Sequence, residues 1–168
     1  MTVKVLNTNY IQGASFESSA DLNHWHKVSG SGHILRANYA TGWTANTPSD
    51  AGAYFLYGTG GNSVTVRQMI NLDNRIANEG TFYYKFSACF GSFGQGDSIE
   101  VALEFRDTNN NLITNCATGE QAPNGVMEYF THIDMLPSGT KSIIVKLILK
   151  RANDTDIDGH VDNMSLTI

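Results

Sequence analysis

The run from Asp154 to Gly159, Asp-Thr-Asp-Ile-Asp-Gly, carries a metal-binding pattern. It matches the start of an EF-hand loop, in which oxygens from alternate residues bind Ca²⁺. The twelfth position of such a loop is a glutamate, whereas here it is Ser165, and no helical pattern flanks the run. We interpret the run as an acidic turn before a strand, and a calcium ion at Asp154, Asp156 and Asp158 stays the alternative.

Histidine and cysteine are the next candidates for metal binding. His24 and His26 flank Trp25, and on a strand they would lie on one side, where they could bind zinc. We favour the simpler interpretation that both are polar residues beside a packed tryptophan. Cys89 and Cys116 lack the short spacing to a second Cys or His that a zinc site needs. They either form a disulfide in an oxidising compartment or remain two separate buried thiols.

Catalytic motifs are missing from the sequence. It has no Gly-x-Ser-x-Gly elbow, no phosphate-binding glycine loop and no His-Glu-x-x-His. Glu100, Glu104 and Glu128 could supply the carboxylate pair of a glycoside hydrolase. Glu100 and Glu104 share one face of a predicted strand, but about 3.3 Å per residue places them roughly 13 Å apart. Both glycosidase mechanisms use shorter separations, so we predict that the protein is not an enzyme.

The elements that position these residues are β-strands. Apolar residues alternate with polar ones from Phe82 to Ala88, and no segment has the period of a helix. Turn-forming runs such as Ser29-Gly30-Ser31-Gly32 separate the strands, and residues 116–125 are predicted to form a long loop. The pattern predicts one all-β domain, a sandwich or a barrel, over residues 1–168. Further strands are predicted at 33–38, 53–57, 64–72, 99–106, 127–134, 143–150 and 160–167.

Composition excludes some classes of function. The formal net charge is −5 and charged residues make up 16% of the chain, which argues against nucleic-acid binding. No stretch approaches 18 consecutive apolar residues, so we expect no membrane span. Low charge combined with many small polar residues is typical of extracellular β-proteins, and we expect a secreted or cell-surface location. No charged-then-apolar leader follows Met1.

Several segments together resemble carbohydrate-binding modules of families 4, 9 and 22, within the galactose-binding-like jelly-roll superfamily. Ala14-Ser15-Phe16-Glu17 is followed by Trp25, as at the start of these modules. Their glutamine-containing strand, aromatic strand and last strand are similar to residues 66–72, 80–88 and 159–166. The resemblance covers residues 14–168 and implies a β-sandwich jelly roll of two antiparallel sheets, with Trp25 as a packing residue.

The resemblance also implies a structural calcium ion. Its side-chain ligands would be Glu17, Asp50 and Asp162, with backbone carbonyl oxygens near Ser15 and Ala53. Calcium takes six to eight hard oxygen ligands, so carboxylates and carbonyls from distant segments suit it. The alternative is that the three acids are ordinary solvated surface residues.

In the resembling modules a glycan lies across the concave sheet, whose strands correspond here to 64–72, 99–106 and 143–150. We expect this face, or the edge loops, to bind a polysaccharide or oligosaccharide. The same charged side chains could equally form an ordinary solvated face. Trp43, in a small polar loop with Tyr39, is either a sugar platform or a lid on the core. The outward residues of the strands would be Arg67, Glu104, Arg106, Lys146 and Lys150.

The expected function is therefore a non-catalytic carbohydrate-binding domain, of the kind that forms one part of a larger enzyme or adhesin. The alternative is a structural or protein-binding jelly roll of a secreted assembly with no sugar ligand.

Overall fold

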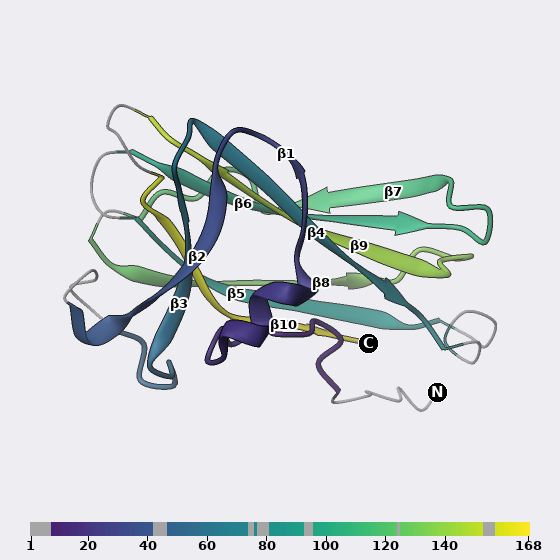
Figure 1. Cartoon of the computed structure of the whole chain (residues 1–168). Coiled ribbons are helices and arrows are strands. Elements are labelled where there is room, and N and C mark those ends of the chain that lie inside the picture. The colour runs from purple at the N-terminus through teal and green to yellow at the C-terminus, as the bar shows by residue number, and fades with distance from the viewer. Residues whose placement is uncertain are drawn as a thin grey trace.

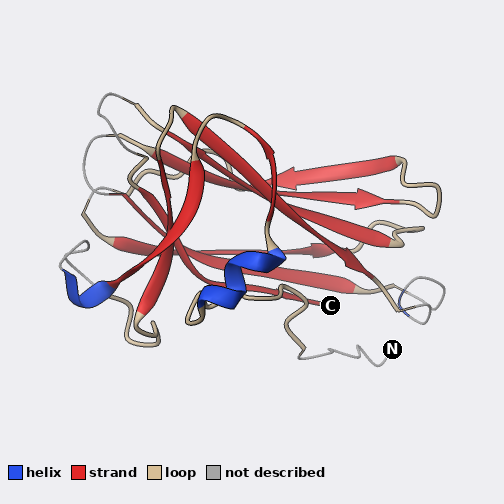
Figure 2. Cartoon of the chain, viewed as in Figure 1, coloured by secondary structure: helices blue, strands red, loops and turns tan. Residues whose placement is uncertain are grey.

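The structure of the chain is a computed structural model, which describes residues 8–41, 47–73, 76, 81–92, 96–123, 125–152 and 157–168. Within these residues, two five-stranded antiparallel sheets face each other as a sandwich (Figure 1). Helical structure in the described part of the chain is limited to short helical turns, as Figure 2 shows. The predicted all-β jelly-roll sandwich is therefore confirmed.

Sheet A has the strand order β1-β4-β9-β6-β7, and every neighbouring pair is antiparallel. Its central strand, β9, comes from late in the chain and pairs with β4 and β6 over its whole length. The strands are β1 (His26–Ser29), β4 (Ser63–Asn71), β9 (Ser142–Lys150), β6 (Ser98–Arg106) and β7 (Leu112–Ala117).

Sheet B has the order β2-β3-β10-β5-β8, and its neighbouring strands are also antiparallel. The last strand of the chain, β10, lies at its centre, and the pairing of β10 with β5 is interrupted by a bulge after Asp162. The strands are β2 (His33–Asn38), β3 (Tyr54–Thr59), β10 (Gly159–Thr167), β5 (Tyr83–Ser92) and β8 (Met127–Met135).

The core forms because each central strand presents apolar residues on its inner face at every second position. In β4, Val64 and Val66 are buried, whereas Arg67 is exposed. Sheet B adds an aromatic cluster, in which the Phe130 ring lies 6.3 Å from that of Phe86 and 6.2 Å from that of Phe90. Burial of large apolar side chains stabilises the fold by roughly 1.5–3 kcal/mol each.

The N-terminal segment joins the two sheets at one end of the sandwich. Tyr10 donates its backbone N–H to the Leu166 carbonyl of β10 at 2.8 Å. On the other side, the buried Gln68 amide of β4 binds both the N–H and the carbonyl of Gln12, at 3.0 and 3.1 Å. Gln68 is therefore a buried polar residue that supplies hydrogen-bond partners for the backbone of the N-terminal segment, which pairs with no strand at this point.

The chain then enters the 3₁₀ helix η1 (Ser19–His24), which a capping box begins. The Ser18 hydroxyl accepts the N–H of Ala20 at 3.2 Å, and the Asp21 carboxylate accepts the N–H of Ser18 at 3.0 Å. Trp25, which follows the helix, is 5% exposed and its ring lies 6.4 Å from that of Phe16. The predicted packing role of Trp25 is confirmed.

Every strand that the alternation predicted is present. The two edge strands of sheet A, β1 and β7, were not predicted. The helix η1 and a second short 3₁₀ helix, η2 (Tyr39–Thr41), were not predicted either. His24 ends η1 and His26 begins β1, so the expectation that both lie on one strand is wrong. None of the described helices has the length and apolar character that a membrane span requires.

Candidate functional site

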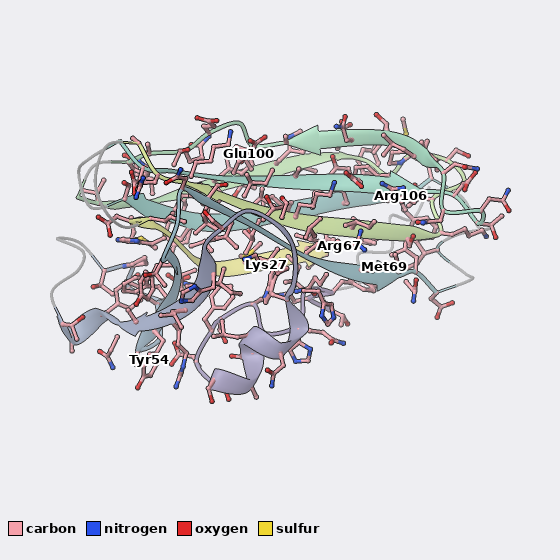
Figure 3. All side chains as sticks on the ribbon, turned by 45° about the horizontal axis from the view of Figure 1, so that its top comes forward. Lys27, Tyr54, Arg67, Met69, Glu100 and Arg106 are labelled. Atoms are coloured by element: carbon pink, nitrogen blue, oxygen red, sulfur yellow. The ribbon has the colours of Figure 1, made fainter. Side chains whose placement is uncertain are left out.

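The outer face of sheet A (the sheet A face) consists of the side chains that alternate with core residues along β4, β9 and β6. Figure 3 looks onto this face and shows Arg67 and Met69 over β4, with Glu100 and Arg106 over β6. Strands hold these groups more rigidly than loops would. Its central members are Thr65, Arg67, Met69, Ile144, Lys146, Ile148, Lys150, Glu100, Ala102, Glu104 and Arg106.

Strand register arranges these side chains in rows across the sheet. The central row runs His26, Arg67, Lys146, Ala102 and Ala117 from β1 to β7. Residues directly opposite on antiparallel strands point to the same face with Cβ atoms about 5 Å apart. The central row therefore starts with three basic residues and ends with two small ones.

The neighbouring rows are partly apolar. On one side lies the row Met69, Ile144, Glu104 and Asn115. Although Ile144 points outward, it is only 1% exposed, so its neighbours cover it. Met69 is 49% exposed and extends the apolar surface to the edge of the face. The face can therefore offer both charged groups and aliphatic surface to one ligand.

Glu104 is the centre of an ionic network on this face. Its Oε2 accepts hydrogen bonds from Arg106 Nη2 at 2.5 Å and Nε at 3.2 Å, and its Oε1 contacts the Lys146 ammonium. Burial tends to raise the pKa of Glu104, but the hydrogen bonds and charges of Arg106 and Lys146 outweigh it and lower the pKa. Glu104 is therefore ionised at neutral pH and cannot act as a general acid.

Lys150 lies apart from this network. Its ammonium pairs with Glu120, from the loop after β7, and Ser98 also donates a hydrogen bond to Glu120 at 3.4 Å. Both charged side chains of the pair are about half exposed, at 45% and 54%. An exposed pair of this kind contributes little to stability, so Lys150 can be displaced from Glu120 at small cost.

A second group of polar residues, the acid cluster, comprises Glu17, Asp50 and Asp162. Glu17 accepts the backbone N–H groups of Ala53 and Tyr54, both at 3.0 Å, and so joins the N-terminal segment to β3. A Cβ at Gly52 would lie 2.0 Å from Glu17 Oε1, so a larger residue there would displace the carboxylate. Arg36 donates to the Glu17 carbonyl at 2.6 Å.

Asp162 is the buried member of the cluster, with 1% of its surface exposed. Its oxygens accept the Tyr39 hydroxyl at 2.9 Å and the Asn163 N–H at 2.7 Å. Burial raises the pKa of Asp162 to about 7; these two hydrogen bonds lower it, and the negative charges of Glu17 and Asp50 raise it further. Among the described residues, no basic side chain forms an ion pair with any of the three acids.

Backbone strain marks the same cluster. Phe16, beside Glu17, has a φ of 54°, and Asn163, beside Asp162, has a φ of 49°. A bulky residue such as phenylalanine rarely adopts the left-handed region, and such strain persists where surrounding structure or function demands it. Both strained residues therefore adjoin an acid of the cluster.

The third acid completes the cluster from the loop before β3. Asp50 Oδ1 contacts the hydroxyl of Tyr129 on β8, and burial, followed by this contact, raises the pKa of Tyr129 to about 12. Burial, followed by the charges of Asp162 and Asp50, also raises the pKa of Cys89 to about 12. Cys89 therefore stays protonated and unreactive beside the acids.

The donor set fits a hard cation only in part. No three His, Cys, Asp or Glu side chains among the described residues converge as a ready-made metal cage. The cluster nevertheless combines a buried carboxylate, two further acids and strained backbone, and Ser15 lines a hollow beside Asp50. The Ala53 carbonyl already accepts the Tyr39 N–H at 3.0 Å. Carboxylate and backbone oxygens are the ligands that calcium prefers.

The structure separates two of the expected sugar-binding residues from the rest. Tyr39 is not on the sheet A face: it is 8% exposed and its hydroxyl binds Asp162, so it belongs to the acid cluster. Trp43 lies outside the described residues, as do Asp154 and Asp156 of the acidic turn. The structure brings Glu104, Arg106 and Lys146 together, places Arg67 directly opposite Lys146, and leaves Lys150 farther along the same face.

Both cysteines are free, which decides between the two alternatives that the sequence left open. Cys89 is buried near the acid cluster, whereas Cys116 lies on β7 and forms a hydrogen bond with the Tyr84 hydroxyl. The two thiols therefore belong to different sheets.

Sequence reasoning missed the residues at the β1 side of the sheet A face. A hollow there is lined by side chains from the N-terminal segment, η1 and β4. The sequence offered no signal for it, because β1 was not predicted and the register of His26 opposite Arg67 could not be known. Its polar lining includes Tyr10, Asn23, His24, His26 and Asn71.

No family model matches the sequence, and no curated protein matches it. Solved structures do share its fold. A family 16 carbohydrate-binding module is similar with a TM-score of 0.65 at 16% identity, over 94% of this chain and 99% of that one. The C-terminal family 22 module of Clostridium thermocellum Xyn10B is similar with a TM-score of 0.59 at 16% identity, over 96% and 94% of the two chains.

Enzymes contain the same fold. The enzymatically active domain of tailspike protein 4 from bacteriophage CBA120 is similar with a TM-score of 0.68 at 14% identity, and the match covers 95% of this chain but 21% of the tailspike chain. The resemblance to carbohydrate-binding modules is confirmed at the level of the fold by the family 16 and family 22 modules described above.

Proposed function

We propose that the chain is a non-catalytic carbohydrate-binding domain whose ligand lies across the sheet A face. The observation that carries the proposal is the arrangement of Glu104 with Arg106 and Lys146 on rigid strands, beside the exposed aliphatic side chain of Met69. Sugars present hydroxyl groups to hydrogen-bonding side chains and CH faces to apolar ones, and this face offers both. The carbohydrate-binding modules among the solved neighbours support the role.

The absence of catalysis is part of the proposal. Glycoside hydrolysis needs one carboxyl group that keeps its proton near neutral pH. Glu104 has a lowered pKa and is bound by two cations, and Glu128 lies on β8 of the other sheet. We expect no release of reducing sugar from any glycan that the protein binds.

A glycan array, followed by a reducing-sugar assay on each glycan that binds, tests this proposal. Binding without hydrolysis agrees with it. Binding accompanied by hydrolysis that a Glu104→Gln variant abolishes would replace it with an enzymatic function. Silence across plant, algal and animal glycans would remove the carbohydrate-binding role altogether.

The second candidate function is protein binding, and the edge of sheet B favours it. Tyr83, Ile133 and Met135 on β5 and β8 are 51%, 61% and 53% exposed. Tyr83 lies opposite Met135, and β8 is an edge strand with one side unpaired. Exposed apolar residues on an edge strand can bind another chain. Protein binding is the function to pursue if the array is silent.

We also propose that the acid cluster binds a structural calcium ion through Glu17, Asp50 and Asp162, with backbone oxygens near Ser15 and Ala53. The support is the buried carboxylate of Asp162, whose pKa the charges of Glu17 and Asp50 raise, and the lack of a basic ion-pair partner for the three acids among the described residues. A cation would neutralise this charge and join the N-terminal segment, the loop before β3 and strand β10. Addition of EDTA should then lower the melting temperature and calcium should restore it, because a ligand of the folded state stabilises it by mass action.

A further inference from the structure

Arg67 is a cation whose immediate neighbours on the sheet A face carry no negative charge. It is exposed at the middle of β4, and its side chain forms no hydrogen bond, ion pair or ring contact with any described residue. Directly opposite it are His26 on β1 and Lys146 on β9. The register therefore places basic groups on both sides of the guanidinium.

The remaining neighbours of Arg67 are neutral. Thr65 and Met69 flank it along β4, and the diagonal positions on β9 are Ile144 and Ile148. Opposite charges directly opposite one another stabilise a sheet, whereas like charges in these positions destabilise it. Here the sequence places like charges together and supplies no acid next to them.

Two acids, Glu104 and Glu100, lie equally far from Arg67 in the register, on β6 beyond β9. Arg106 and Lys146 bind the two carboxylate oxygens of Glu104, and Glu100 forms no ion pair with Arg67. A residue placed against a like charge, with no compensating contact, is expected at a functional site. Because the Arg67 side chain has no such partner among the described residues, a ligand is the group that can supply one.

We propose that the sheet A face binds an acidic glycan, with the carboxylate of a uronic acid residue paired to Arg67; this rests on the carbohydrate-binding function proposed above. One carboxylate balances the charge of the Arg67 guanidinium. The planar guanidinium matches a planar carboxylate through two parallel hydrogen bonds, whereas lysine acts as a point charge. A sulfate ester can also accept two such hydrogen bonds, and the test below separates it from a uronate.

The rest of the row leaves room for the sugar ring. Beyond Lys146 the row continues with Ala102 and Ala117, whose side chains are too short to cover the sheet. The exposed aliphatic side chain of Met69 lies in the neighbouring row. A ring that rests over the alanines can place its CH face on apolar surface while its acidic neighbour reaches Arg67.

The overall charge of the chain, formally −5, opposes a polyanion at long range. At physiological ionic strength the Debye length is only about 8 Å, so a local cation dominates over distant acids. Salt also weakens the ion pair itself, so the affinity for a uronate should fall as the salt concentration rises.

The test measures affinity for oligogalacturonate and for its methyl ester, which keeps the ring and the hydroxyls but removes the charge. Binding of the acid form should be at least about tenfold tighter than that of the ester, the lower range for a hydrogen bond to a charged group. Arg67→Gln should remove that difference. Lys85→Gln is the matched control, because it removes the same charge from the outer side of sheet B and should change neither affinity.

Each other outcome overturns the inference in a distinguishable way. Equal binding of acid and ester, or preferential binding of neutral glycans, overturns the uronate assignment and leaves the proposed function intact. Binding of dextran sulfate but not of any uronate assigns Arg67 to sulfate instead. An equal loss in Lys85→Gln and Arg67→Gln shows a bulk charge effect, and no binding to any glycan defeats both proposals.

Discussion

The substitution Asp162→Asn tests the acid cluster most sharply, because it removes the buried charge while keeping the shape of the side chain. The pKa of Asp162 in the fold is about 7, above its ordinary value of 3.8, so the folded protein holds this proton more tightly than the unfolded chain does. Without metal, the contribution of Asp162 to stability is therefore most favourable at low pH. It falls as the pH rises from 3.8 to about 7 and is level above that range.

The structure sets an upper limit on the loss of stability that the buried charge of Asp162 causes. A rise from 3.8 to about 7, at 1.36 kcal/mol per pKa unit, corresponds to roughly 4 kcal/mol for Asp162, which is 1% exposed. The asparagine can still accept one of the two hydrogen bonds, and the loss of the other costs about 1 kcal/mol. In EDTA above neutral pH, Asp162→Asn should therefore be more stable than the wild type by about 1–3 kcal/mol.

Calcium should reverse this order. The wild type gains about 2.7 kcal/mol when free calcium is a hundred times the dissociation constant, whereas the variant has lost a charged ligand. Urea unfolding across the range from acid to mildly alkaline pH, in EDTA and in calcium, measures both effects. Asp134→Asn on β8 is the control, since Asp134 is exposed. A wild-type stability in EDTA that does not change with pH, or an Asp162→Asn variant that is destabilised there, would refute the reasoning.

Three further predictions concern positions whose contacts are equally specific. Gly52→Ala places a methyl group against the Glu17 carboxylate and should reduce the calcium-induced rise in melting temperature; an unchanged rise contradicts the role of Glu17. Gln68→Ala leaves the N–H and carbonyl of Gln12 without these partners and should lower the free energy of unfolding, measured by chemical denaturation, by about 1–3 kcal/mol. A smaller loss means that other contacts hold the N-terminal segment. Denatured, unreduced protein should show two reactive thiols, and a reducing agent should not change the melting curve; a single thiol or none shows that a disulfide forms.

The central strands could be predicted because they are buried on one face. In β6 and β9 an apolar residue at every second position faces the core, and the alternation that this produces is visible in the sequence. The edge strand β1 has four exposed residues and therefore no alternation to detect. The edge strand β7 is nearly as exposed, and its pairing with β6 contains a bulge.

The candidate site was predictable as a list of outward residues, but its organisation was not. Arg67 and Lys146 are far apart in the sequence, and only the register of β4 with β9 places them opposite each other. The interpretation of Tyr39 failed for a related reason, since its loop position says nothing about the distant Asp162 to which its hydroxyl binds. The resemblance to known modules identified Asp162 as an acid of interest, and the structure adds that it is buried.

The most direct test of the central proposal is a residue-by-residue map of the binding surface. Isotopically labelled protein is titrated with the tightest ligand from the glycan array, and the backbone amide shifts are followed by NMR. A ligand on the sheet A face should shift the amides of β4, β9 and β6 around Arg67, Lys146 and Ala102, and leave those of β5 and β8 unchanged. Shifts confined to sheet B around Tyr83 and Ile133 would place the ligand on the opposite side of the molecule and contradict the proposed site.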